Sequence, residues 1–255
     1  MTNLFDLTGK KAIVTGGTRG LGKSMAEGLM EAGATVVIFG TSEKAYSVAE
    51  EFRAKGFNCQ GLVVDLAKAE ERKAGFDKAV EMLGGLDIIL NAAGIQRRHP
   101  SPDFPMEDWN DVLEVNLTAP FDLSQMAARE FLKKEQPSGK IINVSSMLAF
   151  FGGQTVPAYA ASKGGVSQFT KAMCNELACK GINVNAIAPG YMDTEMNTAL
   201  TDPSNPRFKI ITDRIPAGRW GTGEDMKGVA IFLASAASDY LNGAVIPVDG
   251  GYLVK

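Results

Sequence analysis

The feature that most constrains the fold is an alternation of short, β-rich apolar runs with longer amphipathic segments along nearly the whole chain. Seven runs are predicted as strands: Ala12–Thr15, Thr35–Phe39, Gly61–Val64, Asp87–Asn91, Lys140–Val144, Asn183–Ile187 and Ala244–Val248. Six segments are predicted as helices: Leu21–Ala32, Glu43–Lys55, Lys68–Leu83, Met106–Lys134, Ala158–Lys180 and Glu224–Ala234. Strand, helix and strand in succession predict an α/β fold, with a Rossmann-type, doubly wound, parallel seven-stranded sheet and helices on both faces.

The domain organisation is predicted to be simple. No linker, composition change or internal repeat divides the alternation, so we expect a single domain over residues 1–255. Only the stretch Tyr191–Trp220 departs from the rhythm, with several polar residues and the prolines Pro203, Pro206 and Pro216. We interpret residues 191–220 as an insertion after the sixth strand, and insertions of this length are often lids.

Composition and charge exclude several classes of partner. With 26 basic and 29 acidic residues the net charge is −3, so neither nucleic acid nor an anionic membrane is expected as a partner. No signal-peptide pattern and no long apolar run is found, which predicts a cytoplasmic protein with no membrane span. The three dispersed cysteines indicate reduced thiols, and no metal site is expected.

A glycine-rich turn follows the first predicted strand and opens the first predicted helix. It reads Thr15-Gly-Gly-Thr-Arg-Gly-Leu-Gly22, and such a turn presents backbone amides and a helix dipole to a pyrophosphate. The alternatives are glycines that merely make a turn, and a nucleoside-triphosphate loop, since Gly17-x4-Gly22-Lys23-Ser24 also matches that pattern. The turn lies between a predicted strand and a predicted helix near the N-terminus, which favours a dinucleotide. The triphosphate loop is disfavoured because no acidic strand end plainly serves a magnesium ion. The predicted contacts are Gly16, Thr18, Arg19, Gly20, Leu21 and Gly22.

A phenol and an ammonium group stand four residues apart at Tyr159 and Lys163, on one face of a predicted helix. A nearby cation favours phenolate and lowers a tyrosine pKa from about 10 toward the working pH. A tyrosine of this kind can exchange a proton with an alcohol or a ketone. A solvated surface pair would give the same spacing.

Several motifs occur in a fixed order along the chain. They are Thr15-x3-Arg19-Gly20-x-Gly22, Asn91-Ala-Ala-Gly94, Asn116, Ser146 thirteen residues before Tyr159, Tyr159-x3-Lys163, and Pro189-Gly190. In this set the chain resembles the short-chain dehydrogenase/reductase family from Thr15 to Gly251. The resemblance implies an NAD(P)-dependent oxidoreductase with the catalytic residues Asn116, Ser146, Tyr159 and Lys163.

The resemblance also implies a role for each residue. Tyr159 would be the acid and base, Ser146 would hydrogen-bond the reacting oxygen, Lys163 would tune Tyr159 and hold the nicotinamide ribose, and Asn116 would anchor a relay water. Ser145 is the adjacent rival of Ser146, and Asp65, the implied adenine contact, would also serve as a strand-end cap. Ala92 departs from the asparagine usual at its position. The further cofactor contacts implied are Thr41, Ser42, Asp65, Leu66, Asn91, Ala92, Ala93, Gly94, Tyr159, Lys163, Pro189, Gly190, Met192 and Thr194.

The choice of dinucleotide stays open between NAD and NADP. Gly40 stands where an acidic residue usually holds the ribose 2′-hydroxyl, and Arg19 could pair with a 2′-phosphate, which together favour NADP. Some members of the family use NAD without that acid, so NAD remains the alternative. The family resemblance further implies a homo-oligomer, a dimer or tetramer, formed through the two long helices.

The loop after the fourth predicted strand carries candidate substrate contacts. It reads Gly94-Ile-Gln-Arg-Arg-His-Pro100 at the carboxyl edge of the sheet, where ligands bind, and an arginine there can grip a carboxylate with two hydrogen bonds. Paired arginines that face water are the alternative. The predicted contacts are Gln96, Arg97, Arg98, His99, Ser146, Met147, Gln154 and Tyr159.

Longer stretches, including Asn91–Pro100, Ile215–Gly221 and Ser146–Phe150, resemble family members that act on gluconate or 2-dehydro-3-deoxygluconate. They imply a small-molecule sugar acid as substrate, with a secondary alcohol and a ketone interconverted. The alternatives are reduction of a 3-oxoacyl thioester or another small ketone, and a non-catalytic nucleotide-sensing protein. The intact Tyr159, Lys163 and Ser146 speak against a protein without turnover.

Overall fold

The computed structural model describes residues 3–202 and 204–255, and Pro203 therefore lies outside the described residues. One sheet contains seven strands, all parallel, in the order β3-β2-β1-β4-β5-β6-β7. The strands are β1 (Lys11–Thr15), β2 (Thr35–Gly40), β3 (Cys59–Val63), β4 (Ile88–Asn91), β5 (Gly139–Val144), β6 (Ile182–Pro189) and β7 (Val245–Val248). The predicted α/β class, the parallel pairing and the number of strands are confirmed.

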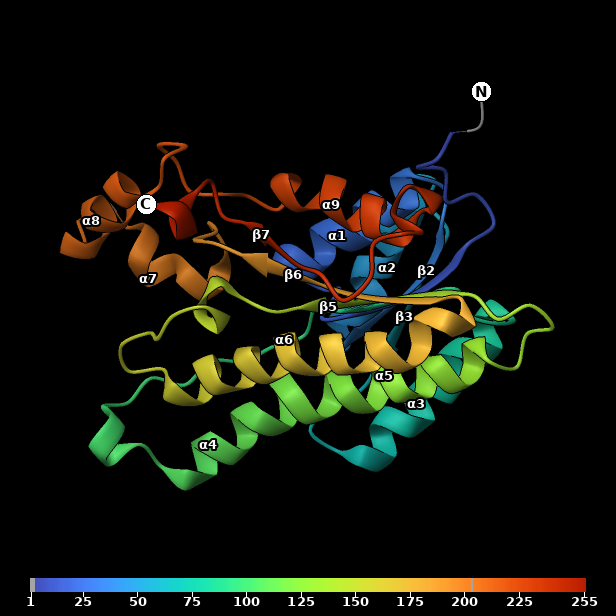
Figure 1. Ribbon diagram of the computed structural model, residues 1–255, viewed down its shortest axis with the longest axis horizontal. Helices are drawn as coiled ribbons and strands as arrows, with labels where there is room; N and C mark the ends of the chain where they lie inside the picture. The colour runs from blue at the N-terminus through green and yellow to red at the C-terminus, as the bar shows by residue number, and fades with distance from the viewer. Residues whose placement is uncertain (1–2, 203) are drawn as a thin grey trace.

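Helices cover both faces of the sheet (Figure 1). The helices are α1 (Gly20–Glu31), α2 (Lys44–Ala54), α3 (Ala69–Leu83), α4 (Met106–Leu113), α5 (Ala119–Phe131), α6 (Pro157–Leu177), α7 (Thr198–Thr201), α8 (Pro206–Arg214) and α9 (Glu224–Ala234). Helices α1, α2 and α9 lie on one face, and α3, α5 and α6 lie on the other. This arrangement gives the doubly wound layers that the alternation predicts.

The core consists of two apolar layers, one on each side of the sheet. Side chains alternate along a strand, so Val14 and Ile38 pack into the layer under α1 and α9, whereas Ile13 and Val37 pack into the layer over α3 and α5. Because both faces are covered, the central strands are apolar at nearly every position.

The helix predicted over Met106–Lys134 is found as helical backbone over residues 106–131, ending three residues earlier than predicted and divided by a turn that the prediction lacks. A single π-helical turn, Glu114–Thr118, separates α4 from α5, and it contains the buried Asn116. A π turn places one more residue in the turn than an α-helix does, and such turns often occur at functional sites. Apolar periodicity does not register this change, because the helix continues on both sides of it.

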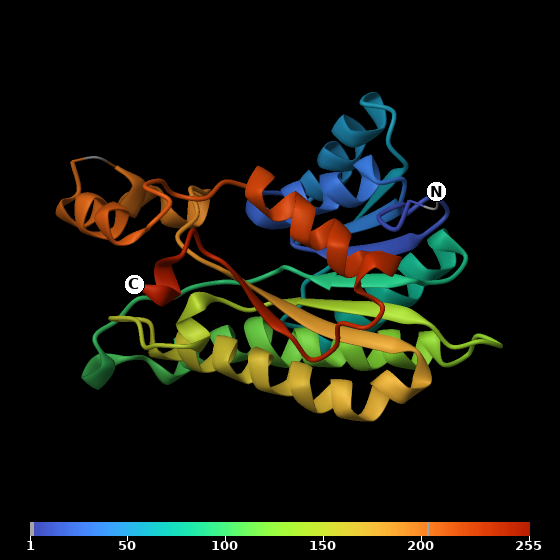
Figure 2. The same ribbon diagram turned by 45° about the horizontal axis from the view of Figure 1, so that its top comes forward.

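The segment after β6 projects past the carboxyl ends of the strands, beside the C-terminus (Figure 2). The predicted insertion over residues 191–220 contains the two short helices α7 and α8, for which no helix was predicted. Ile211 and Ile215 of this segment are buried with Trp220 and Tyr252 in a small separate core. The insertion therefore carries its own packing instead of lying loosely on the surface.

The strand order reverses direction between β1 and β4. From β1 the chain builds outward to β2 and β3, and then returns to place β4 on the other side of β1. A crevice opens at the carboxyl ends of the strands where the order reverses, and ligands bind there in doubly wound folds. In the described part of the chain, no helix is both long and apolar enough to cross a bilayer.

Candidate active site

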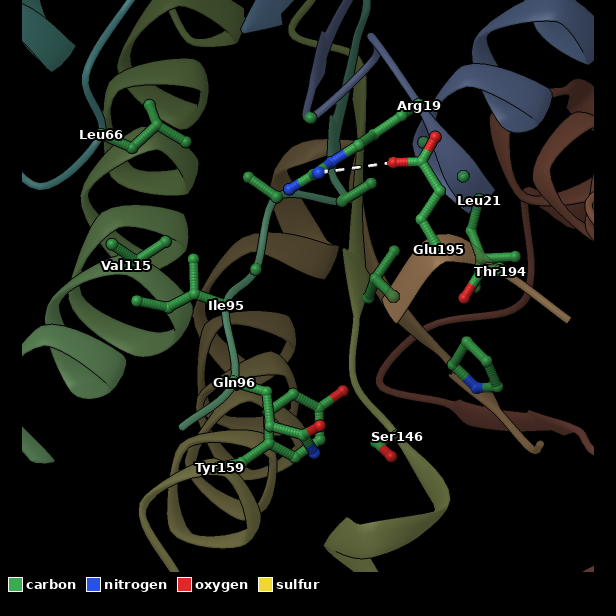
Figure 3. A pocket seen from close by; sticks show the side chains of 18 of the residues that line it. Arg19, Leu21, Leu66, Ile95, Gln96, Val115, Ser146, Tyr159, Thr194 and Glu195 are labelled. Carbon is green, nitrogen blue, oxygen red and sulfur yellow. Dashed lines mark hydrogen bonds and ion pairs between the residues drawn. The ribbon is translucent and has the colours of Figure 1, made fainter. Parts of the chain in front are cut away.

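A cleft of about 700 Å³ runs along the carboxyl ends of the strands, within the usual size range of ligand sites. Most of the residues predicted to bind cofactor or substrate line it: Gly16, Thr18, Arg19, Gly20, Leu21, Gly22, Thr41, Asp65, Leu66, Ala92, Ala93, Gly94, Gln96, Arg97, Arg98, Ser146, Tyr159, Lys163, Pro189, Gly190, Met192 and Thr194. Figure 3 shows Arg19 and Leu21 toward one end of the cleft, and Gln96, Tyr159 and Ser146 toward the other.

The glycine-rich turn is packed tightly against the loop that follows β4. Gly16 has a φ of +66°, and a Cβ there would lie 2.8 Å from the Cα of Ala93. A Cβ on Gly22 would overlap the carbonyl oxygen of Gly16. The Thr15 hydroxyl accepts hydrogen bonds from the backbone N–H groups of Ala92 and Ala93, each at 3.1 Å. The turn therefore holds the N-terminus of α1 at the floor of the cleft, where it can face an anionic group.

Tyr159 and Lys163 both lie in the first two turns of α6. The Lys163 Nζ lies 5.6 Å from the centroid of the Tyr159 ring and donates a hydrogen bond of 2.7 Å to the carbonyl oxygen of Val144. The Lys163 side chain is buried, and burial lowers the pKa of its ammonium group to about 8. The ammonium group therefore depends on the backbone of β5 for the partner that water would otherwise provide.

The pKa of Tyr159 differs from the expectation drawn from the sequence. Burial raises the pKa of the phenol, while the Ser146 hydroxyl and the positive charge of Arg98 act to lower it. The expected lowering by Lys163 is therefore not what dominates this site. The desolvation of the phenol outweighs the nearby charges, and the cation that does favour phenolate comes from the loop after β4.

The two neighbouring serines have different partners. The Ser145 hydroxyl is buried against α6, where it donates 3.0 Å to the carbonyl oxygen of Lys163 and lies 2.7 Å from the Ser167 hydroxyl. The Ser146 hydroxyl accepts a hydrogen bond from the backbone of Leu148 and faces Tyr159. Of the pair, only Ser146 directs its hydroxyl to the phenol, so the geometry favours Ser146 over Ser145.

Asn116 holds the loop after β4 from below. Its Oδ1 accepts a hydrogen bond of 2.8 Å from the N–H of Ile95, and its Nδ2 donates 2.8 Å to the carbonyl oxygen of the same residue. Asn116 is fully buried and does not line the cleft itself. By fixing Ile95 at both backbone groups, it sets the position from which Gln96 and Arg98 enter the cleft.

The dinucleotide end of the cleft leaves no room for an acid at the end of β2. A Cβ on Gly40 would lie 2.5 Å from the Cγ2 of Thr18. Arg19 lies at the same end, where its Nη1 is 3.4 Å from the Glu195 Oε2, and both side chains are largely exposed (Figure 3). Asp65 lines the cleft and also caps the following turn, since its Oδ1 accepts from the N–H of Ala67 at 3.0 Å.

The predicted substrate contacts on the loop after β4 differ in whether the chain already supplies a partner for them. Arg97 Nε pairs with Asp108 at 3.2 Å, and His99 Nε2 lies 2.6 Å from the other oxygen of the same carboxylate. Within the described residues, the guanidinium of Arg98 has no hydrogen-bond or ion-pair partner. Arg98 is therefore the cation of this loop that is free to meet a ligand.

Five predicted contacts lie away from the cleft walls of the described chain. Asn91 is buried and donates to Asn143 and Ser124, while its Oδ1 has no partner. Met147 belongs to the small core under α8, His99 is paired with Asp108, and Ser42 and Gln154 are exposed elsewhere. Conversely, the sequence reasoning missed Ile95, Val115, Glu195 and Asn197, which line the cleft. Glu195 directly follows a predicted contact, Thr194, which is the one signal that could have suggested it.

In the part of the chain that the structure describes, no group of three or more His, Cys, Asp or Glu side chains is placed to hold a metal ion.

Comparisons with known proteins give a consistent result. The family described as short chain dehydrogenase matches residues 10–205. A 2-dehydro-3-deoxy-D-gluconate 5-dehydrogenase of Dickeya dadantii (strain 3937) is 46% identical over 253 residues, covering 99% of both chains. A 5-keto-D-gluconate 5-reductase of Escherichia coli (strain K12) is 41% identical over 256 residues, covering 100% of this chain and 99% of the relative.

The fold also matches a solved structure closely. The crystal structure of a gluconate 5-dehydrogenase from Burkholderia cenocepacia J2315, in complex with NADP and tartrate, has a TM-score of 0.94 and 42% sequence identity. The match covers 99% of this chain and 98% of that one.

Proposed function

This chain belongs to the short-chain dehydrogenase family and is an NAD(P)-dependent oxidoreductase, and we propose that it interconverts a secondary alcohol and a ketone on a sugar acid of the gluconate or 2-dehydro-3-deoxygluconate type. The observation that carries the proposal is the unpaired guanidinium of Arg98 in the cleft beside the phenol of Tyr159. An arginine can bind a carboxylate with two parallel hydrogen bonds, which fixes an acidic substrate in one orientation. The relatives named for sugar acids support the same substrate class.

The residues at the catalytic end have the chemistry that this reaction needs. In the direction of oxidation, Tyr159 takes the proton of the substrate hydroxyl as a general base, and in reduction it returns a proton to the carbonyl oxygen. The Ser146 hydroxyl hydrogen-bonds the reacting oxygen, and Asn116 holds the loop that positions the substrate. Lys163 places a positive charge behind Tyr159. A bound nicotinamide ring would supply the hydride acceptor or donor.

The residues that would hold the dinucleotide lie along the remaining cleft. The N–H groups of the turn from Gly16 to Gly22 and the start of α1 suit a pyrophosphate, and Lys163 lies where it could reach the nicotinamide ribose. Gly40 brings no acidic side chain to the end of β2, and Arg19 is exposed beside the cleft, so the site favours a 2′-phosphate over a 2′-hydroxyl and we propose a preference for NADP. An exposed ion pair such as Arg19 with Glu195 contributes little stability, which leaves the guanidinium available.

Steady-state rates with each dinucleotide test the cofactor proposal. We expect a higher kcat/KM with NADPH than with NADH, and Arg19→Ala should remove most of that difference by raising the KM for NADPH alone. A clear preference of the unaltered protein for NADH would contradict the proposal.

Paired substrates test the substrate class. Oxidation of gluconate is compared with oxidation of glucitol, which has the same secondary hydroxyls but a neutral CH₂OH group in place of the carboxylate. Arg98→Ala should raise the KM for gluconate about tenfold or more, whereas Arg97→Ala, which removes a cation already paired with Asp108, should have a smaller effect. Faster reduction of a 3-oxoacyl thioester than of any keto-aldonate would overturn the sugar-acid proposal.

We propose further that the protein is a cytoplasmic homo-oligomer. Three free thiols suit a reducing compartment. Phe121 of α5 remains 42% exposed beside Phe169 of α6, which leaves apolar surface on the two helices that the family resemblance points to. Light scattering after size exclusion should give the mass of a dimer or tetramer, and a monomer would contradict the proposal.

A further inference from the structure

One arginine of the described chain is almost completely buried. Arg72 of α3 is 3% exposed, and arginine is rarely buried to this extent unless its guanidinium is paired. Its Nη1 donates hydrogen bonds to the carbonyl oxygen of Leu66 at 2.6 Å and to the Glu114 carboxylate at 2.5 Å. Its Nε donates at 3.0 Å to the Asp122 carboxylate. None of these contacts involves the proposed catalytic residues.

The three partners of Arg72 belong to three different segments. Leu66 lies in the loop after β3, Glu114 begins the π-helical turn, and Asp122 is in the first turn of α5. The side chains of Glu114 and Asp122 are 35% and 33% exposed, so water still reaches both carboxylates. Burial of a charged group carries a desolvation cost, and a buried ion pair is therefore weak evidence for net stability. The contacts of Arg72 do fix the relative positions of the three segments.

Two of these segments form one wall of the cleft. Leu66 and Val115, which directly follows Glu114, both line the cleft, whereas Arg72 does not. Figure 3 shows Leu66 and Val115 on the same side of the cleft. One guanidinium nitrogen of Arg72 bonds both to the backbone of Leu66 and to the residue before Val115. The separation of the two apolar side chains is therefore set by directed hydrogen bonds as well as by packing.

This wall lies where the adenosine half of the dinucleotide is placed. Figure 3 shows Leu66 at the end of the cleft away from Tyr159, beside which the nicotinamide would react. With the pyrophosphate at the glycine-rich turn, the adenosine half extends toward the ends of β2 and β3. The faces of a purine ring are largely apolar, so the aliphatic side chains of Leu66 and Val115 suit them.

We infer that Arg72 is a positioning residue for dinucleotide binding. Through its bonds to Leu66 and Glu114 it holds Leu66 and Val115 at the separation that the adenine ring needs. This role rests on the proposed function, which places the dinucleotide in the cleft with its adenosine half at this wall. Without Arg72, the wall would have to be ordered at the moment of binding, and affinity would fall.

Calorimetric binding of ADP-ribose tests this role. ADP-ribose contains the adenosine half and the pyrophosphate common to NAD and NADP, but it lacks the nicotinamide. Arg72→Met keeps an unbranched side chain without the donors, and it should raise the Kd about fivefold or more. Arg72→Lys should recover part of the affinity, because one ammonium group can still bond to the Leu66 carbonyl or to a carboxylate.

Arg53→Met is the matched control. The Arg53 Nη1 likewise donates from a helix to the backbone of β3, at 2.8 Å to the carbonyl oxygen of Cys59, but neither residue lines the cleft. The Kd for ADP-ribose should therefore stay unchanged in Arg53→Met. A second variant, Glu114→Ala, frees the start of the π turn while Arg72 keeps Leu66 and Asp122, and it should weaken ADP-ribose binding in the same direction.

Kinetics separate this role from a merely structural one. Asn116 is held by its own two bonds to the backbone of Ile95, so the catalytic end should keep its geometry when Arg72 is removed. Arg72→Met should raise the KM for NADPH, but keep kcat within about twofold and leave the KM for 5-ketogluconate unchanged. A lower melting temperature with an unchanged Kd for ADP-ribose would overturn the inference.

The outcome does not depend on a single variant or on the identity of the substrate. If Arg72→Met does not fold, Glu114→Ala decides, and a Kd equal to that of Arg53→Met would overturn the inference. Absence of sugar-acid turnover in the unaltered protein would overturn the proposed substrate, whereas calorimetry with ADP-ribose needs no substrate. Absence of ADP-ribose binding by the unaltered protein would overturn the inference together with the placement of the dinucleotide.

Discussion

The catalytic groups of the cleft and its substrate-binding end beside them are stabilised in different ways. At the catalytic end, buried polar side chains are held by the backbone: Lys163 by the carbonyl of Val144, and Asn116 by both backbone groups of Ile95. At the substrate end, the Arg98 guanidinium has no hydrogen-bond or ion-pair partner among the described residues, although it lines the cleft. The difference indicates that the fold preorganises the catalytic groups, whereas the guanidinium at the substrate end lacks a negatively charged partner from the chain itself.

The strongest test of the preorganised end is Tyr159→Phe. The phenyl ring keeps the packing but loses the hydroxyl that would exchange the proton, so kcat should fall by about 10³-fold or more, while the affinity for the dinucleotide stays unchanged. Steady-state kinetics and fluorescence titration with NADPH measure the two effects. Tyr240→Phe, at a fully exposed tyrosine, is the control and should have no effect. Turnover retained in Tyr159→Phe would mean that another group carries the proton.

Gly22→Ala tests how tightly the glycine-rich turn is packed. The new Cβ would overlap the Gly16 carbonyl oxygen, and such overpacking should cost about 1–3 kcal/mol in dinucleotide binding or in stability. Gly228→Ala is the matched control, because Gly228 lies inside α9 with open space around its Cβ position and should gain roughly 0.5–1 kcal/mol. Calorimetric binding and urea unfolding separate the two costs. Equal behaviour of the variants would show that the turn is looser than its geometry indicates.

Lys163→Met tests how much folding stability is lost by burying the Lys163 ammonium group. Burial places the pKa of Lys163 at about 8 in the folded chain, whereas an unfolded lysine titrates near 10.4. Between these values the unfolded chain binds a proton that the folded chain lacks, so the stability of the unaltered protein rises with pH from about 8 to 10. The full destabilisation by the buried ammonium group is therefore present below about pH 8. Removing the ammonium group should therefore stabilise the fold at pH 7 by about 1–2 kcal/mol, after the loss of the Val144 hydrogen bond.

Urea unfolding at pH 7 and pH 9.5 measures this effect, and the advantage of Lys163→Met should shrink at the higher pH. Lys171→Met, at an exposed position of the same helix, is the control and should show no such trend. A variant that is less stable than the unaltered protein at both pH values would show that Lys163 contributes net stability.

The smallest expected effect is the influence of Arg98, a predicted substrate contact, on the pKa of Tyr159. Arg98 acts to lower the pKa of Tyr159, so Arg98→Gln should raise that pKa and move the pH profile of kcat for oxidation to higher pH. The profile is recorded at saturating gluconate, so that weaker binding does not enter. Arg97→Gln is the control, and an identical shift in both variants would mean that Arg98 has no special position relative to the phenol.

The sequence by itself determined the sheet and most of the dinucleotide site. Apolar runs that alternate with amphipathic segments predict a parallel doubly wound sheet, because each central strand buries both faces and each helix buries one. The glycine turn and the Tyr159–Lys163 spacing are local patterns, readable without knowing what lies opposite. Elements whose boundaries depend on packing were less readable: the π turn at Asn116 interrupts a helix without changing its apolar pattern.

Only the tertiary structure decided which charges remain free and which direction a pKa takes. The sequence cannot tell Arg97 from Arg98, since the difference is that Asp108 folds back to reach one of them. The raised pKa of Tyr159 likewise follows from burial, which is a property of the assembled site and not of the four-residue spacing that first pointed to it.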